Sequence, residues 1–79
     1  MRAAGEPTRL RLLALLEKVD LTVSDLIAIL DQSQPRISRH LKLLVAAGLA
    51  ERFQEGAWAY FRTVDHGAAR VFLNTVLKP

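Results

Sequence analysis

The sequence predicts a mainly α fold with one small β-hairpin, in the order three-helix core, two-stranded hairpin and C-terminal helix. Three features of the residue pattern predict it. Apolar residues recur at helical spacing up to Val45, the pattern becomes that of strands after Gly48, and helical spacing returns after Val64. We expect a single domain over residues 1–79, because a chain of this length forms one small core.

The composition narrows the class of protein. Hydrophobic residues make up 51% of so short a chain, which favours burial of some surface against a second copy. The net charge of +3 is compatible with nucleic-acid binding but does not by itself indicate it. No segment approaches the roughly 18 consecutive apolar residues of a membrane span, and residues 1–8 lack the apolar run of a signal peptide. We therefore expect a soluble, cytoplasmic protein.

Two helices are predicted before residue 31. The first spans about residues 7–19, because Pro7 suits an early helical position and an apolar stripe follows it. The stripe consists of Leu10, Leu12, Leu13, Ala14, Leu15 and Leu16. The second spans residues 23–30, because Thr22 and Asp25 have the spacing of a capping box. Its core face consists of Leu26, Ile27 and Leu30.

The third helix spans residues 34–47 and completes a helix-turn-helix. Ser33 can cap it, Pro35 lies in its first turn, and Gly48 ends it. Its predicted core face is Ile37, Leu41, Leu44 and Val45. Only about three residues separate it from the preceding helix, which is the arrangement of a helix-turn-helix.

A β-hairpin is predicted over residues 50–64, with strands at about 49–54 and 58–64 around a turn that contains Gly56. Strand alternation puts Trp58 and Tyr60 on one face and Phe61 on the other, so at least one of these aromatic residues belongs to the core. We expect Phe53 to be a core residue as well. A hairpin directly after the third helix is a wing, and the predicted fold is a winged helix-turn-helix.

The last segment, residues 65–78, is predicted to be helical. Its apolar residues spread over roughly 240° of the helix surface, which is more than one contact with a small core can cover. We expect the same helix of a second subunit to cover the surplus, which gives a homodimer.

The outer face of the third helix is the candidate functional site. With the core face turned inward, its outward and boundary residues are polar or basic: Gln34, Arg36, Ser38, Arg39, His40 and Lys42. Arginine can bind guanine and glutamine can bind adenine in the major groove, while serines suit phosphate oxygens. A charged outer face is often merely solvated, but this one has no acidic residue between Gln34 and Ala50 and follows a tight turn. These features favour binding to double-stranded DNA.

Two stretches, GEPTRLRLLALL and LTVSDLIAILDQSQPRISRHLKLLVAAGLAERFQEGAWAYFR, resemble the winged helix-turn-helix domain of ArsR-type transcriptional repressors. The segment SRHLKLLVAAGL is similar to the family's S-x-H-L-x-x-L-x-x-A-G-L pattern. The resemblance implies a homodimer that represses transcription from an imperfect palindrome and is released by a metal ion or another signal. By position it implies DNA contacts from Ser33, Gln34, Arg36, Ser38, Arg39 and His40, with wing contacts from Arg52, Gln54 and Arg62.

Two positions depart from the metal-sensing members of that family. Where they often carry a Cys-Val-Cys element, this chain has Thr22-Val23-Ser24 and no thiol. Where others ligate zinc from the C-terminal helix, it offers only the adjacent Asp65 and His66, while zinc takes about four ligands. We interpret this pair as a helix N-cap and a surface histidine. We expect no metal effector and no cofactor.

Two further interpretations of the chain stay open. The wording DQSQPRISRHLKLL with EGAWAYFR particularly resembles a branch in which this domain precedes an S-adenosylmethionine-dependent methyltransferase, so the chain could be the DNA-targeting or regulatory module of a longer protein. A winged helix can also be a protein–protein interaction module, but that use would require an apolar third-helix face. Catalysis is not expected, because the chain has no phosphate loop and no Ser-His-Asp set that we can place in one pocket.

Overall fold

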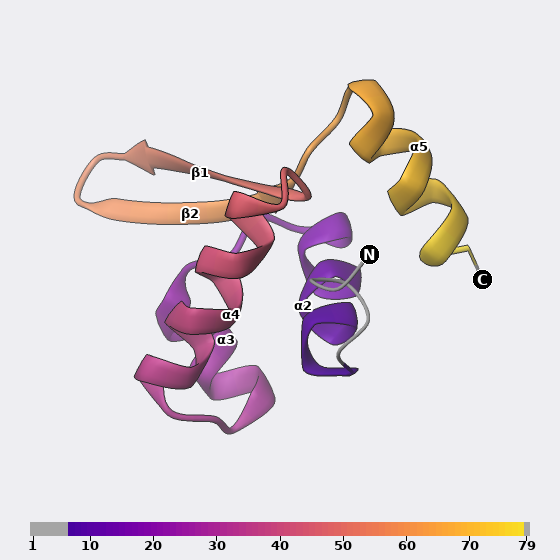
Figure 1. Cartoon of the computed structure of the whole chain (residues 1–79). Helices are drawn as coiled ribbons and strands as arrows, with labels where there is room; N and C mark the ends of the chain where they lie inside the picture. Colours follow the sequence, from indigo (N-terminus) through magenta and orange to yellow (C-terminus); the bar gives the residue numbers. More distant parts are fainter. Residues whose placement is uncertain (1–6, 79) are drawn as a thin grey trace.

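The computed structural model describes residues 7–78, and residues 1–6 and Pro79 lie outside the described part. Most of the segment that we interpret as lacking the apolar run of a signal peptide therefore lies outside the described residues. Within residues 7–78, four helices and one hairpin follow each other (Figure 1). They are α2 (Pro7–Lys18), α3 (Val23–Leu30), α4 (Gln34–Ala46), β1 (Ala50–Glu55), β2 (Trp58–Thr63) and α5 (Gly67–Val76). The hairpin extends to one side of the three-helix core and α5 lies toward the other (Figure 1).

The helix-turn-helix has the predicted start and stop signals. Thr22 caps α3 in a complete capping box with Asp25, and Ser33 caps α4. Asp31 ends α3 in the left-handed conformation with φ of 54°, and Gly48 follows α4 with φ of 77°. These local signals set the short turn that places α4 against α3.

The two strands pair in antiparallel register from Ala50 opposite Thr63 to Glu55 opposite Trp58. The base of the hairpin is attached to the helical core by an isolated bridge to the segment before α3. Leu21 and Phe61 exchange two backbone hydrogen bonds of 3.1 and 2.8 Å. The direction in which the hairpin leaves the core is therefore fixed at its base.

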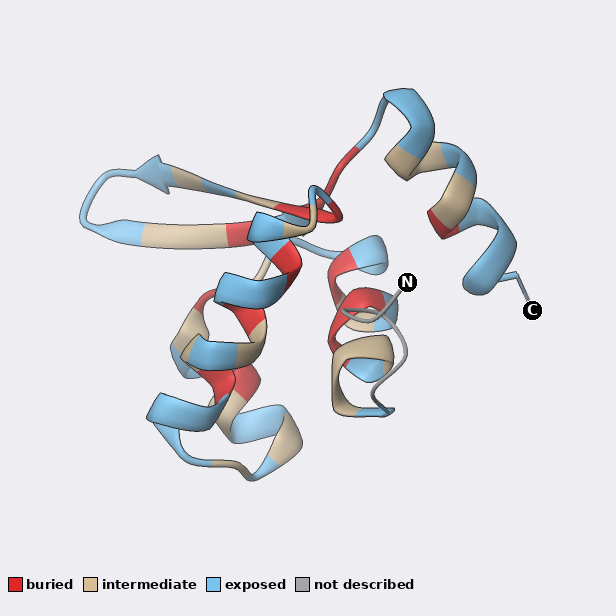
Figure 2. Cartoon of the chain, viewed as in Figure 1, coloured by how far each residue is buried: buried red, intermediate tan, exposed pale blue. Residues whose placement is uncertain are grey.

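The core lies where α2, α3 and α4 face one another and meet the base of the hairpin, whereas the hairpin tip is exposed (Figure 2). Leucine dominates it, as the helical stripes predict. The buried apolar residues are Leu12, Leu13, Leu16, Leu26, Ile37, Leu41, Leu44, Leu49, Ala50, Phe61, Val64 and Leu73.

Three residues predicted for the core lie elsewhere. Ala14 is exposed on α2, and Val45 is 39% exposed on α4, because each sits at the edge of a stripe that the neighbouring helices do not reach. Phe53 is only half-buried, because the hairpin projects past the helices and has no layer to pack against at that point. Phe61, at the base of the hairpin, is the aromatic residue of the wing that belongs to the core.

The last helix begins two residues later than predicted. His66 is its N-cap residue, with extended backbone and no side-chain capping bond, and Gly67 follows with φ of 71°. The interpretation of Asp65 as the cap was therefore wrong, because the N-cap position falls on His66. Only Leu73 of α5 is fully buried, and Val71 is 67% exposed.

Candidate nucleic-acid interface

The outer face of α4 is exposed and positively charged. Arg36, Arg39 and Lys42 are exposed, whereas Ile37, Leu41 and Leu44 of the same helix are buried. The helical period separates the two sets, so that burial of the apolar stripe turns the basic residues outward. The helix contains no acidic residue to neutralise them.

The first turn of α4 is organised by its own polar side chains. Ser33 Oγ accepts a hydrogen bond from the backbone nitrogen of Arg36 at 3.4 Å. The side-chain amide of Gln34 donates to Ser38 Oγ at 2.7 Å. Both side chains lie at the positive end of the helix dipole, where a phosphate or a base edge is electrostatically favoured.

A neighbour from another helix joins this face. Arg9 of α2 lies with its Nη1 atom 3.2 Å from Nδ1 of His40. Arg9, Arg36, Arg39, His40 and Leu43 line one open hollow of about 580 Å³. Sequence reasoning missed Arg9, because it is 31 residues from His40 and nothing in the α2 pattern shows which helix its polar face would meet.

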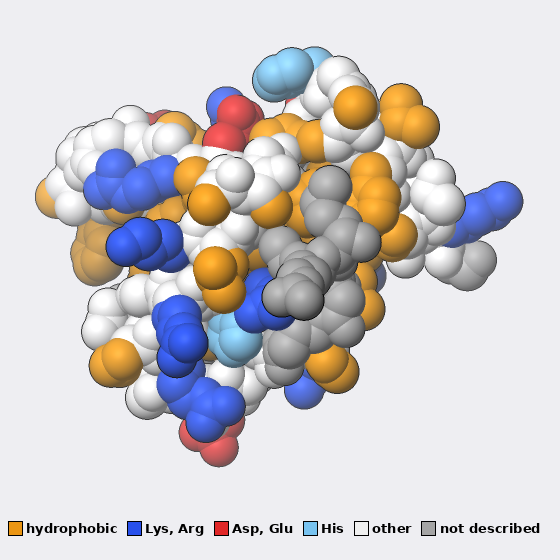
Figure 3. Space-filling view, in the orientation of Figure 1, with side chains coloured by type: hydrophobic (Ala, Val, Ile, Leu, Met, Phe, Trp, Pro, Cys, Tyr) orange, Lys and Arg blue, Asp and Glu red, His pale blue; other side chains and the backbone are white. Residues whose placement is uncertain are grey.

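The wing adds two more predicted residues on the side of α4. Arg52 and Gln54 are opposite Phe61 and Ala59 in the register, so the four share one face of the hairpin. Arg52 Nη2 donates to Gln54 Oε1 at 3.3 Å, and Gln54 Nε2 donates to the carbonyl of Gly56 at 3.2 Å. In the view of Figure 3, Lys and Arg side chains form a row over α4 and the hairpin, and acidic side chains lie only at the ends and edge of this row.

Arg62 lies on the opposite face of the hairpin. It is paired in the register with Glu51, and its Nε is 2.8 Å from Glu51 Oε1. Its guanidinium also lies 4.4 Å from the centre of the Phe53 ring, which stacks on Tyr60. Seven of the ten predicted site residues therefore lie on α4 or its cap, and Arg52 and Gln54 share one face of the hairpin, whereas Arg62 lies on the other face.

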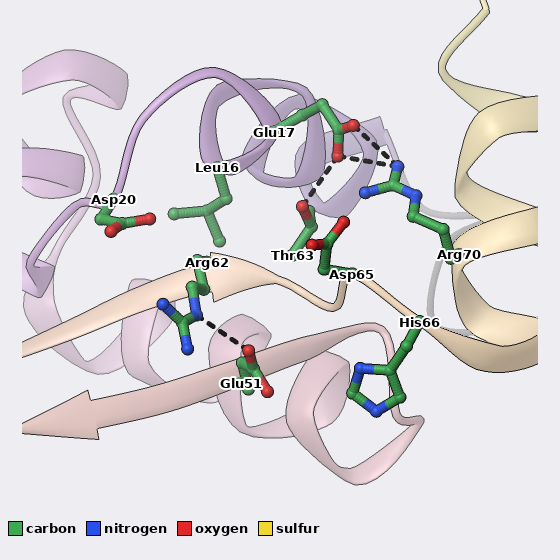
Figure 4. Close-up of a pocket in the computed structure, with 9 residues that line it drawn as sticks. All are labelled: Leu16, Glu17, Asp20, Glu51, Arg62, Thr63, Asp65, His66 and Arg70. Atoms are coloured by element: carbon green, nitrogen blue, oxygen red, sulfur yellow. Dashed lines mark hydrogen bonds and ion pairs between the residues drawn. The ribbon is translucent and has the colours of Figure 1, made fainter.

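A second polar hollow, of about 630 Å³, lies among α2, the hairpin base and the start of α5 (Figure 4). At its centre the carboxylate of Glu17 accepts hydrogen bonds from Thr63 Oγ1 at 2.7 Å and from Arg70 Nη2 at 2.7 and 2.9 Å. Partial burial raises the pKa of Glu17, but the bonds from Thr63 and Arg70 and the charge of Arg70 outweigh it, so the pKa lies below its ordinary value of 4.5. The carboxylate of Glu17 thus links α2 to β2 through Thr63 and to α5 through Arg70.

Asp65 and His66 also line this second hollow, but their side chains point in different directions (Figure 4). Within residues 7–78, no three side chains of His, Cys, Asp or Glu are placed so that they could hold a metal ion. In the same part of the chain, no helix is long and apolar enough to cross a membrane.

A three-helix core with a basic outer helix and an adjoining hairpin defines the winged helix-turn-helix class. Residues 6–52 match the family model described as "Bacterial regulatory protein, arsR family". The chain therefore belongs to the arsR family of bacterial regulatory proteins. This membership agrees with the resemblance found in the sequence.

Two relatives illustrate the similarity. The chain is 45% identical over 63 residues to the arsenical resistance operon repressor of Escherichia coli (strain K12), which covers 78% of this chain and 54% of that protein. It is 33% identical over 76 residues to the HTH-type transcriptional repressor SmtB of Mycobacterium tuberculosis (strain H37Rv), with 96% and 56% covered. The chain thus spans about half the length of these relatives.

Solved structures share the fold. The transcriptional repressor BigR from Xylella fastidiosa superposes with a TM-score of 0.84 at 23% identity, covering 95% of this chain and 73% of that one. The homodimeric winged helix-turn-helix DNA-binding domain Mb0332 from Mycobacterium bovis, a possible ArsR-family regulator, superposes with a TM-score of 0.81 at 27% identity. That match covers 94% of this chain and 68% of the other.

Proposed function

We propose that the chain is a sequence-specific, double-stranded DNA-binding transcriptional repressor. In this proposal, α4 enters the major groove and the wing follows the adjacent backbone or minor groove. The observation that carries it is the outer face of α4, where Arg36, Arg39 and Lys42 are exposed without an acidic neighbour on the helix. The names of the two repressors described above support it.

The proposed contacts divide by chemistry. Arg36 and Arg39 are the candidates for guanine edges or phosphates, because a guanidinium can bind both in a bidentate manner. Ser33, Gln34, Ser38, His40 and Lys42 would support them from α4, and Arg9 would add positive charge beside His40. Arg52 and Gln54 would contact the backbone from the wing, and Arg62 could do so only from the opposite face of the hairpin.

The test is the affinity for duplex DNA, measured by fluorescence anisotropy as a function of salt. The double variant R36A/R39A should lose most of the affinity, at roughly 1–3 kcal/mol for each base contact, and its salt dependence should be shallower. R11A/K78A is the matched control, because it also removes two positive charges, but at exposed positions outside the proposed interface. Equal binding by R36A/R39A and the control would show that α4 does not read DNA.

We further propose that the chain acts as a homodimer on a palindromic operator. The exposed apolar side chains of α5, Val71 and Val76, are the candidates for the contact between subunits. The homodimeric Mycobacterium bovis domain supports the assignment. A dimer would present two copies of α4 related by twofold symmetry, which matches an operator with two half-sites.

We propose that the signal that releases the repressor from DNA is not a metal ion bound within one chain. The chain has no cysteine, and residues 7–78 offer no group of three metal-ligating side chains. The proposed site of action is the cytoplasm, where the DNA of a bacterial regulator lies.

The finer resemblance, to the branch that precedes a methyltransferase, remains a prediction, and the coding sequence beyond codon 79 tests it. The alternative use as a protein–protein module is disfavoured by the charge of the α4 face. A folded chain that binds no duplex at low salt would favour that alternative.

A further inference from the structure

The C-terminal half of α4 and the facing side of the hairpin enclose an open hollow of about 390 Å³. Most of its lining is apolar and comes from Val23, Leu41, Val45, Ala46 and Phe61. Its polar lining residues are Ser38, Lys42 and Arg52. Apolar walls with a few converging polar groups, at this volume, are typical of small-molecule sites.

Val45 is a lining residue whose apolar character is not explained by packing in the core. Leu41 and Phe61 are buried and belong to the core, so their apolar character stabilises the fold. Val45 is 39% exposed and lies outside the buried core cluster. The apolar side chain of Val45 lowers the free energy of the molecule only when another group covers it and removes it from water.

The charge of the hollow defines the kind of occupant. Lys42 from α4 and Arg52 from β1 bring two positive charges to it, and no acidic residue lines it. In the described chain, neither side chain forms an ion pair, and the partner of the Arg52 guanidinium is the neutral amide oxygen of Gln54. A hollow lined by apolar side chains and two cations is complementary to a molecule with an apolar body and an anionic group.

We propose that this hollow binds a small organic anion, an aromatic or aliphatic carboxylate or sulfonate. Its apolar body would lie against Val45 and Phe61, and its anionic group between Lys42 and Arg52. Ser38, Lys42 and Arg52 also belong to the DNA interface proposed above. The ligand and DNA therefore exclude each other, a consequence that rests on the proposed function.

The experiment titrates the folded full chain with the fluorescent probe anilinonaphthalene sulfonate, which has this chemistry. The wild-type chain should give a saturable increase in fluorescence. V45D should weaken binding about tenfold, because it places a carboxylate against the apolar body of the probe and adds a negative charge to a hollow that binds an anion. L43D is the matched control: it adds the same charge to the same helix at a residue that is 43% exposed and does not line the hollow.

A loosened but compact V45D chain cannot imitate the expected result, because such states bind this probe more strongly, and the circular dichroism of V45D shows whether the chain is fully unfolded. The absence of saturable binding to the wild-type chain, or equal weakening by V45D and L43D, would overturn the proposal. Duplex DNA, added at concentrations that anisotropy shows to saturate the chain, should displace the probe. A probe that stays bound beside DNA would overturn the mutual exclusion. If V45D loses probe binding and the wild-type chain binds no DNA, the proposed ligand site is supported and the proposed function is rejected.

Discussion

Thr22 and Asp25 exchange two hydrogen bonds at the start of α3. Asp25 N donates to Thr22 Oγ1 at 3.1 Å, and Thr22 N donates to Asp25 Oδ2 at 3.0 Å. T22A should lower the free energy of unfolding by about 1 kcal/mol, because the backbone N–H of Asp25 loses its acceptor, Thr22 Oγ1. Urea denaturation measures it, and S24A at the exposed neighbouring position should change stability far less. Similar losses in both variants would mean that the capping box does not stabilise the native state.

Glu17 gives the stability a pH dependence of known sign. Its folded pKa lies below 4.5, so the stability that it contributes is present above the unfolded pKa and is lost as pH falls through the folded pKa. The difference in unfolding free energy between wild type and E17Q should therefore be largest near neutral pH and shrink in acid. Denaturant titrations at several pH values measure it. D20N, at an exposed carboxylate lining the same hollow, is the control, and a pH-independent difference for E17Q would contradict the prediction.

The residues that sequence pattern could not place are those whose position depends on a second element. Each helix start and stop of the helix-turn-helix was predictable, because caps and left-handed residues act within a few positions of the chain. Val45 and Phe53 were misplaced, because whether an apolar residue is covered depends on how far the neighbouring element extends. The contact of Arg9 with His40 and the opposite orientation of Arg62 likewise required the tertiary arrangement.

The hairpin is an element whose turn depends on one residue. Gly56 has φ of 61°, whereas Ala57, the other residue of the two-residue turn, does not have positive φ. A Cβ at Gly56 would meet nothing within 4 Å, so only the backbone conformation opposes a side chain there. G56A should therefore destabilise the chain by about 1–2 kcal/mol. Thermal unfolding measures it, and G56N should lose less, since asparagine tolerates this conformation better.

At the scale of the whole molecule, the proposed dimer depends on the exposed apolar side of α5. Val71 is 67% exposed although α5 is one of only four described helices available to enclose the core. If α5 joins two subunits, the melting temperature should rise with protein concentration, and V71D should abolish that rise and sediment as a monomer. A concentration-independent melting temperature in the wild type would contradict the proposed dimer. V19D, at an exposed valine after α2, is the control.

The exchange of hydrogen bonds between Leu21 and Phe61 has a mechanical consequence. The hairpin is clamped where β2 meets the chain leading into α3, while its tip at Gly56 has no neighbouring layer. Because few contacts hold the tip, bending there costs little. Rotation at the base of the hairpin would strain the backbone that positions α3. In the proposed complex with DNA, the wing would therefore adapt to the width of the groove without altering the angle at which α4 is presented.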